Sequence, residues 1–244
     1  MAMFSYDHLT FRYEPFPIGI AKPVLRDEHY RRLLESYPPL ELFKNIPKLG
    51  NKYSLSERFN PEQYRQFIRY QPDWRALHEW IKSEDFIQGV MDTLLQHHID
   101  LGYRPPGERD WLKRLKDIRR GRGLKTRFEF SMLPADGGHI MPHTDAPAKI
   151  VTLIVSMVGE GEWQPEFGGG TDVNWPRDPA RSYNQLNRQA GFDEVDTLHT
   201  YEFTPNQAVI FIKTFNSWHS VRPMGGTGAD AMRRTLTINI EREG

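Results

Sequence analysis

The run KIVTLIVSMV, residues 149–158, is rich in β-branched side chains and has the length of a buried strand. Three further segments read as strands: RFEFSML (127–133), whose apolar residues alternate, YEFTPNQAVIFIK (201–213) and RRTLTINIE (233–241). Turn residues separate the four segments. We therefore expect the second half of the chain to form a sandwich or barrel of strands.

Upstream of these strands, residues 24–100 have a mostly helical pattern. In LRDEHYRRLLESYP (25–38), apolar side chains share one helical face and Asp27 can cap the first turn. In KSEDFIQGVMDTLLQHHIDLG (82–102), Ser83 is the expected cap, and the acidic residues after it favour a helix start. Helices before strands indicate the α+β class.

We expect a single domain over residues 1–244. Residues 1–126 would be mainly helical support, and residues 127–244 would form the β core, with the helices packed on one side. The helical part alone has too few candidate core residues to fold by itself.

Two polar stretches have no clear period. PKLGNKYSLSERFNPEQY (47–64) contains several turn residues, and we expect a loop there. Residues 171–200 are polar and poorly periodic, and irregular segments of that length are usually functional lids or disordered. We predict a lid, in which Trp175 and Tyr183 either contact a substrate or only pack.

The composition excludes several classes of protein. The 244 residues include 32 basic and 32 acidic side chains, and the net charge of +0 argues against broad nucleic-acid binding. We expect the basic run at 109–127 to be a solvated helix face followed by a loop. No apolar run reaches the ~18 residues of a membrane span, and the start lacks a signal-peptide pattern, so we expect a cytoplasmic protein.

The chain has no cysteine. This excludes disulfides, zinc–thiolate sites, iron–sulfur clusters and cysteine nucleophiles. Nine histidines and 32 acidic residues leave histidine–carboxylate metal chemistry as the main option.

The segment PADGGHIMPHTDAPAKIVTLIVSM carries His143 and Asp145 two positions apart, just before a strand. In an extended segment, residues i and i+2 point to the same side, so an imidazole nitrogen and a carboxylate oxygen would converge. The candidate third ligand is His219, which follows the strand AVIFIK. Two histidines and one carboxylate form the facial triad of non-haem Fe(II) oxygenases.

An iron site of this kind needs a co-substrate that supplies electrons, and 2-oxoglutarate is a dianion whose distal carboxylate requires a cation. Arginine binds a carboxylate through two parallel hydrogen bonds. In RRTLTINIE, Arg233 shares the polar face of the strand with Thr235, whereas Arg234 shares the apolar face. We predict that Arg233 is the anchor, with Arg234 as the alternative.

In order and spacing, these features resemble the prolyl 4-hydroxylase-like Fe(II)/2-oxoglutarate-dependent dioxygenases. The resemblance covers residues 129–243 and includes His143-Thr144-Asp145, GGGTDV (168–173), TPNQAVIF (204–211), HSVRP (219–223) and RRT (233–235). It implies a double-stranded β-helix (jelly-roll, cupin-like) core. It also implies Fe(II) as the metal, and 2-oxoglutarate and O2 as co-substrates.

The same resemblance implies roles for individual residues. The catalytic iron would be bound by His143, Asp145 and His219. The 2-oxoglutarate would be bound by Arg233 at its C5 carboxylate, by Thr235 beside it and by the hydroxyl of Thr152.

The chain departs from the family pattern at two positions. Leu133 precedes Pro134 where many members have a tyrosine that helps to bind 2-oxoglutarate. Gln207 stands where a glycine is common. These departures concern the detail of the pocket and leave the triad intact.

For each of the remaining candidate residues, a structural role is an alternative to a functional one. His139 lies in a Gly/Pro-rich segment and would sit near the pocket mouth. Lys149 faces the substrate or only caps its strand. Asn216 and Trp218, next to His219, line the pocket or only pack. The other positions are structural in our reading, as helix-end, strand-edge and tight-turn residues: His97, His98, His199 and Gly168–Gly170.

The sequence therefore predicts an enzyme that hydroxylates an unknown substrate and releases succinate and CO2. A small-molecule substrate is the first hypothesis. A protein side chain such as proline is the second, and a non-catalytic jelly-roll binding protein is the third, against which the intact triad argues. Nucleic-acid demethylation is supported only by the basic run.

Overall fold

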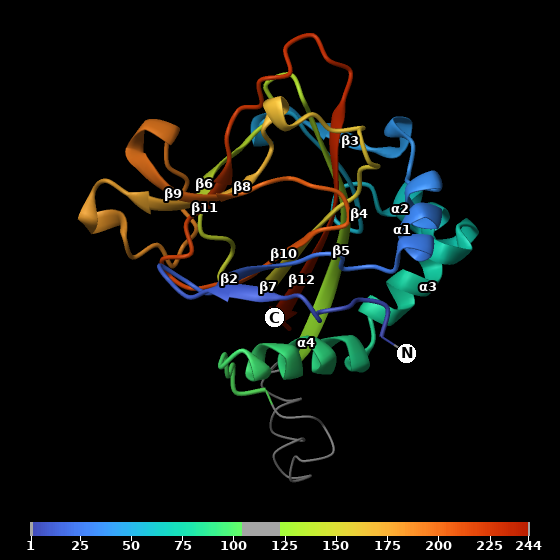
Figure 1. The fold of residues 1–244 in the computed structure, drawn as a ribbon, viewed down its shortest axis with the longest axis horizontal. Helices are drawn as coiled ribbons and strands as arrows, with labels where there is room; N and C mark the ends of the chain where they lie inside the picture. The colour runs from blue at the N-terminus through green and yellow to red at the C-terminus, as the bar shows by residue number, and fades with distance from the viewer. Residues whose placement is uncertain (1, 104–122, 244) are drawn as a thin grey trace.

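The structure, a computed structural model, describes residues 2–103 and 123–243 (Figure 1). These residues form two antiparallel sheets. The larger sheet has the order β1 (Thr10–Arg12), β2 (Ile18–Ala21), β10 (Ala208–Ile212), β7 (Lys149–Ser156), β12 (Met232–Arg242), β5 (Leu124–Pro134), β4 (Lys52–Ser56) and β3 (Lys44–Ile46). The smaller sheet has the order β6 (Ile140–His143), β11 (His219–Val221), β8 (Thr171–Pro176) and β9 (Val195–Tyr201).

From β5 onward, the chain moves repeatedly between the two sheets. Strands β5, β7, β10 and β12 belong to the larger sheet, and β6, β8, β9 and β11 belong to the smaller one. This arrangement is the double-stranded β-helix, or jelly roll. The predicted α+β class with a jelly-roll core is confirmed.

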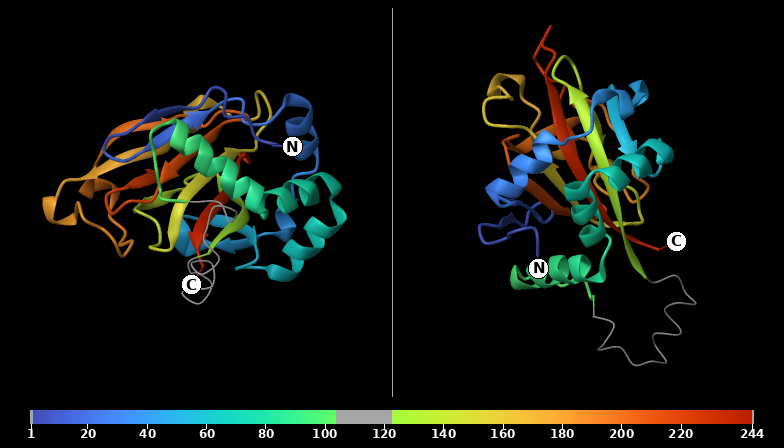
Figure 2. Two further views of the ribbon diagram at one scale, coloured as in Figure 1. Left: turned by 90° about the horizontal axis from the view of Figure 1, so that it is seen from below. Right: turned by 90° about the vertical axis from the view of Figure 1, so that its right-hand side faces the viewer.

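The helices cover the face of the larger sheet that points away from the smaller sheet (Figures 1 and 2). They are α1 (Asp27–Glu35), α2 (Pro61–Tyr70), α3 (Pro72–Ile81) and α4 (Glu84–Gln96). Ser83 caps α4 as predicted, because its hydroxyl accepts the Phe86 N–H at 3.2 Å. The predicted cap of α1 is wrong: Asp27 is the first helical residue, where its carboxylate favours the helix dipole.

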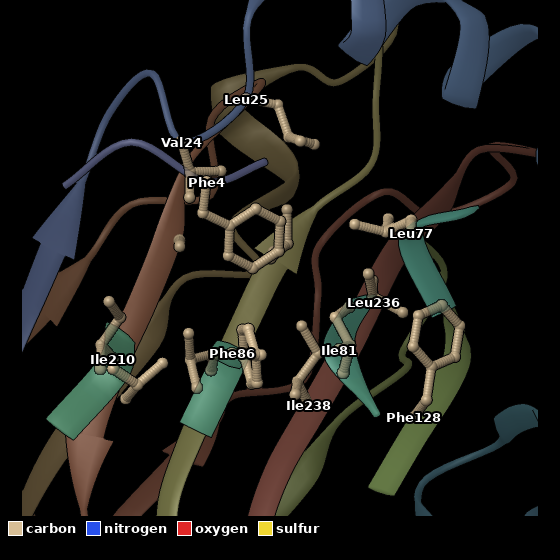
Figure 3. Packing of buried hydrophobic residues seen from close by; sticks show 14 of the residues in the cluster. Phe4, Val24, Leu25, Leu77, Ile81, Phe86, Phe128, Ile210, Leu236 and Ile238 are labelled. Atoms are coloured by element: carbon tan, nitrogen blue, oxygen red, sulfur yellow. The ribbon is translucent and has the colours of Figure 1, made fainter. Parts of the chain in front are cut away.

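The main core lies between the helices and the larger sheet (Figure 3). Phe128 and Phe130 on β5 meet Trp74 of α3, and the Trp74 and Phe130 rings are 4.7 Å apart between centroids. All three side chains are at most 1% exposed. Each such burial contributes about 1.5–3 kcal/mol, so this layer attaches the helices to the sheet that carries the site.

The prediction of a loop over 47–64 is wrong. That segment contains β4, whose Leu55 pairs with Phe130 of β5, followed by the start of α2. The alternation of β4 is hidden because its inner face carries buried serines, Ser54 and Ser56. Strands β1 to β4 also show that the first half of the chain contributes to the larger sheet in addition to supplying helices.

The prediction of an irregular segment over 171–200 is also wrong. Strands β8 and β9 pair with each other there, and only residues 177–194 form the connection between them. Buried polar residues conceal the strand pattern: Asp172 binds Arg222 through two hydrogen bonds, and Asn174 donates to Ser220 at 2.7 Å. Their polar atoms are satisfied, so burial is tolerated.

Two other expectations concern the chain outside this core. Across the described ranges, every helix is too short or too polar to cross a bilayer. Residues 109–122 of the basic run lie outside the described residues, and the end of the run begins β5.

Candidate metal centre

Two neighbouring strands bring the predicted histidines together. His143 is the last residue of β6 and His219 is the first residue of β11, and the two are direct partners in the antiparallel pair. Directly opposite residues of such a pair project to the same face. The two imidazole rings lie 4.3 Å apart between centroids.

Asp145 reaches the same point by a different route from the predicted one. It lies beyond the end of β6 and has φ +70, in the left-handed region, so alternation along a strand does not aim its side chain. Aspartate tolerates this conformation better than most residues do. Its Oδ1 lies 3.4 Å from His143 Nε2, and its Oδ2 lies 3.9 Å from His219 Nε2.

The connection between β8 and β9 holds the loop that carries Asp145. The Thr144 N–H donates to Asn187 Oδ1 at 3.1 Å, and the Thr144 hydroxyl donates to the Asn184 carbonyl at 2.7 Å. The Ala190 N–H donates to the Pro142 carbonyl at 2.9 Å. Residues 177–194 therefore support the metal-binding loop from outside.

Hydrogen bonds select the tautomer of both histidines. His143 Nδ1 lies 2.9 Å from the Met141 carbonyl, and His219 Nδ1 lies 2.9 Å from the Ser217 carbonyl. A carbonyl only accepts, so each Nδ1 carries a proton, and in the neutral ring the lone pair lies on Nε2. Burial, with a smaller contribution from His143, lowers the pKa of His219 to about 3, so its ring is neutral at neutral pH.

Asp145 is held in its ionised form. Burial opposes ionisation, but the Lys149 ammonium, 2.7 Å from Oδ1, outweighs it and holds the pKa of Asp145 well below its usual range. The Thr152 hydroxyl lies 3.2 Å from Oδ2 and is shared with Asn239 Oδ1 at 3.0 Å. One ligand atom from each of His143, Asp145 and His219 lies within 4.8 Å of the others.

Arg233 is buried in the same part of the molecule, with 5% of its surface exposed. Its Nε donates to the Gly169 carbonyl at 2.5 Å, and its guanidinium lies 4.5 Å from the centroid of the Phe203 ring. Burial lowers its pKa to about 10. Among the described residues, no carboxylate forms an ion pair with this guanidinium.

Arg234 projects to the opposite face of β12. It forms an ion pair with Glu162, and its guanidinium lies 5.5 Å from the centroid of the Tyr37 ring. The alternation of β12 thus places Arg234, which pairs with an acidic residue, and Arg233, which has no acidic partner among the described residues, on opposite faces.

A single cavity of about 120 Å³ lies between the two sheets. Every site residue predicted from the sequence borders it: His143, Asp145, His219, Arg233, Thr235 and Thr152. Thr235 is buried beside Arg233, and its hydroxyl lies 3.4 Å from the Ser131 carbonyl. The structure therefore brings the candidate ligands and the candidate anion-binding arginine together, and their roles stay predictions.

No protein-family model matches the chain, and no curated protein matches it significantly. Among solved structures, a prolyl hydroxylase from Trichoplax adhaerens, solved with a peptide fragment of hypoxia-inducible factor, aligns at a TM-score of 0.51 and 12% identity. The alignment covers 92% of this chain and 83% of that one. The chain has the prolyl hydroxylase fold.

Two further structures align over similar lengths. A prolyl-4-hydroxylase from Pseudomonas putida aligns at a TM-score of 0.47 and 15% identity, over 93% of this chain and 92% of that one. An oxidoreductase of the 2OG-Fe(II) oxygenase family from Burkholderia pseudomallei aligns at a TM-score of 0.48 and 11% identity, over 93% of this chain and 86% of that one.

Within this prolyl hydroxylase fold, sequence reasoning missed one cavity residue and the acidic residue that neutralises it. Lys52 lines the cavity from β4 and binds Glu129 of β5 at 2.6 Å, with Ser54 donating to the same carboxylate at 2.9 Å. The prediction of a loop over 47–64 removed Lys52 from consideration. Recognising the alternation of serines with Tyr53 and Leu55 could have found it.

The other candidates lie away from the three ligand atoms. His139 Nδ1 bonds the Gly137 carbonyl, and its ring packs 5.9 Å from Phe192. Trp218 is buried and donates to the Arg181 carbonyl. The others lie at the end of α4, on edge strand β9, on the surface or in turns: His97, His98, His199, Trp175, Tyr183, Asn216 and Gly168–Gly170.

Proposed function

We propose that this protein is an Fe(II)- and 2-oxoglutarate-dependent oxygenase that hydroxylates a small molecule. One observation carries the proposal. The cavity that joins the His143, Asp145 and His219 ligand atoms also contains Arg233, a buried cation with no acidic partner among the described residues. A buried charge is costly unless it is paired, so this guanidinium calls for an anionic ligand.

The ligand set fits Fe(II). Two imidazole nitrogens and one carboxylate on one side of a metal leave the remaining positions open, as in the facial triad of non-haem iron oxygenases. The carbonyls that accept from His143 and His219 fix the orientation of both rings, as hydrogen bonds to metal-binding histidines do.

The arginine fits one end of 2-oxoglutarate. The Nε of Arg233 is occupied by the Gly169 carbonyl, which leaves the two terminal nitrogens to form a bidentate pair with a carboxylate. Phe203 lies against the guanidinium and restrains it. Thr235 on the same face of β12 is the nearest candidate for a further hydroxyl contact.

When bound, Fe(II) and 2-oxoglutarate supply oxidative chemistry: with O2, a substrate C–H becomes C–O–H while 2-oxoglutarate becomes succinate and CO2. The residues of the chain supply position and exclude water. His143, Asp145 and His219 hold the metal, and Thr152 restrains the Asp145 carboxylate. Leu133, Ile154 and Phe211 line the cavity with apolar surface.

The test is spectroscopic. Under nitrogen, wild-type protein with Fe(II) and 2-oxoglutarate should show a weak visible charge-transfer band, and Asp145→Ala should lack it. In air, wild type should form succinate slowly without added substrate. A wild-type protein with neither the band nor succinate would refute the assignment.

The two arginines provide a matched control for the co-substrate site. Arg233→Met should raise the 2-oxoglutarate KM by about tenfold or more, since a charge-assisted hydrogen bond contributes about 1.5–3 kcal/mol. Arg234→Met should leave it nearly unchanged. The reverse pattern would move the co-substrate site to the other face of β12.

The alternatives from the sequence predict other outcomes. A protein hydroxylase would add one oxygen atom to a polypeptide, which mass spectrometry of treated peptides detects. A non-catalytic binding protein would form no succinate in air even if it bound Fe(II).

A further inference from the structure

Lys149 is the charged residue closest to the candidate metal ligands. It begins β7, its Nζ lies 2.7 Å from Asp145 Oδ1, and 18% of its side chain is exposed. It borders the cavity that contains the three ligand atoms. It also borders a second cleft, so Lys149 lies between the cavity and that cleft.

The charged residues that line the cavity are mostly basic. Among the described residues, they are Lys52, Lys149 and Arg233 against the single carboxylate of Asp145. Lys52 is neutralised by Glu129, which lies 2.6 Å away. The two positive charges of Arg233 and Lys149 are therefore balanced by only one negative charge in the cavity lining, that of Asp145.

The proposed metal and co-substrate do not remove this imbalance. Fe(II) brings two positive charges and 2-oxoglutarate brings two negative charges, so together they add no net charge. Asp145 becomes a metal ligand and gives up part of its negative charge to the iron, which weakens its hold on the neighbouring ammonium. The loaded site keeps one positive charge, located at Lys149.

A second lysine adds to the positive charge on the same side. Lys213 lines the second cleft with Lys149, and its Nζ donates to the Thr214 carbonyl. Burial lowers the pKa of Lys213, whereas the Asp145 carboxylate raises it, so Lys213 also lies within electrostatic reach of the metal ligands. Among the described residues, Lys213 forms no ion pair.

We propose that the substrate is a small anion, and that the Lys149 ammonium binds its carboxylate or phosphate beside the metal. This inference rests on the proposed function and narrows its substrate class. The bound anion compensates the Lys149 charge, which would otherwise stay uncompensated in a partly buried site. Arg233 remains committed to 2-oxoglutarate.

The experiment uses the full chain loaded with Fe(II) and 2-oxoglutarate under nitrogen. The probes are acetate, methyl phosphate and neutral acetamide, and broadening of their methyl proton signals measures binding. The charge-transfer band is recorded throughout, because its loss would show that a probe displaces 2-oxoglutarate. Lys149→Met removes the charge and Lys149→Arg retains it. Lys82→Met is the control, because Lys82 is a partly exposed lysine that pairs with Glu57 and does not line the cavity.

Wild type, Lys82→Met and Lys149→Arg should bind at least one of the two anions about tenfold tighter than acetamide, and Lys149→Met should lose that preference. Preference for acetate identifies a carboxylate substrate, and preference for methyl phosphate identifies a phosphate. Equal binding of all three probes by wild type, or an unchanged preference in Lys149→Met, would overturn the inference.

Two readouts separate this inference from its alternatives. A wild-type protein without the charge-transfer band defeats the proposed function itself, whereas a normal band without anion preference defeats only the substrate class. Fe(II) affinity distinguishes a positioning role: removing a cation near the metal should leave the affinity unchanged or tighter in Lys149→Met. Weaker Fe(II) binding with intact anion preference would assign Lys149 to holding Asp145 instead.

Discussion

His143 and His219 are direct partners across β6 and β11, with their ring centroids 4.3 Å apart. The pairing of two short strands thus sets the separation of two candidate ligands that are distant in sequence. Because each Nδ1 is held by a carbonyl two residues earlier, both Nε2 atoms point toward Asp145. The candidate metal site is formed by the smaller sheet and completed by the loop that leads to β7.

His219→Ala should weaken Fe(II) binding by about 100-fold or more, because even partners of metal ligands contribute about 10–100-fold to affinity. His199→Ala, on edge strand β9, is the matched control and should bind Fe(II) as wild type does. Anaerobic Fe(II) titration of both variants measures the difference. Similar losses in the two variants would remove His219 from the ligand set.

Gly169→Ala should raise the 2-oxoglutarate KM with little change in Fe(II) affinity. Gly169 has φ +80, and an added Cβ would lie 3.1 Å from Arg233 Cδ and 3.0 Å from both Met224 Sδ and Trp163 Cζ2. The Gly169 carbonyl also accepts from Arg233 Nε. Gly168→Ala carries similar backbone strain, with φ +76, but its Cβ would enter open space.

The two glycine variants therefore separate displacement of Arg233 from general strain. Steady-state kinetics should show the larger KM change in Gly169→Ala, and thermal unfolding should show destabilisation of both. An equal KM in both variants would mean that Gly169 does not position the arginine.

Asn187→Ala should weaken Fe(II) binding by about tenfold, the lower end of the loss for residues that orient metal ligands. Its side-chain oxygen accepts the Thr144 N–H at 3.1 Å, next to the left-handed backbone of Asp145. Leu186→Ala changes a neighbouring side chain that is 70% exposed and should have no effect. If Asn187→Ala binds Fe(II) as tightly as Leu186→Ala, the connection 177–194 does not support the loop.

The stability of the protein should fall as pH decreases from about 6.5 to about 4, partly because of His78. Burial, assisted by Lys82, lowers the pKa of His78 to about 4, so the unfolded chain binds this proton and the folded chain does not. The contribution of neutral His78 to stability is complete above the pKa of the unfolded state. It is lost as pH falls toward the pKa of the folded state.

His78→Phe should remove that part of the pH dependence, since the ring packs 5.2 Å from Phe128 and phenylalanine keeps the apolar contact. Urea unfolding at several pH values measures it. As pH falls from about 6.5 to about 4, the free energy of unfolding of the variant should rise relative to that of wild type. A constant difference over that range would contradict the assigned burial.

Local patterns were sufficient for much of the fold. The β-branched run of β7 and the alternation of β12 are properties of a few neighbouring residues, and the structure confirms both strands. The Ser83 cap of α4 is equally local. The separation of Arg233 from Arg234 follows from the same two-residue period, because it requires only that the segment be extended.

Other features depended on partners distant in the chain. β4 was predicted as a loop because its serines become buried only when β5 pairs with it and Glu129 accepts from Ser54. β8 was hidden for a similar reason, since Asp172 is buried against Arg222. Polar side chains give no sequence signal for burial when their partners lie elsewhere in the chain.

The sequence by itself determined four strands of the jelly roll, β5, β7, β10 and β12, and the residue types that could bind a metal and a dianion, since both depend on short-range periodicity and side-chain chemistry. Only the tertiary structure decided that Asp145 turns toward the two histidines through a left-handed backbone, and that Lys149 lies beside it. These relationships arise from the pairing of β6 with β11 and from the support of residues 177–194. Contacts between distant segments form only when the whole chain folds, so no local pattern encodes them.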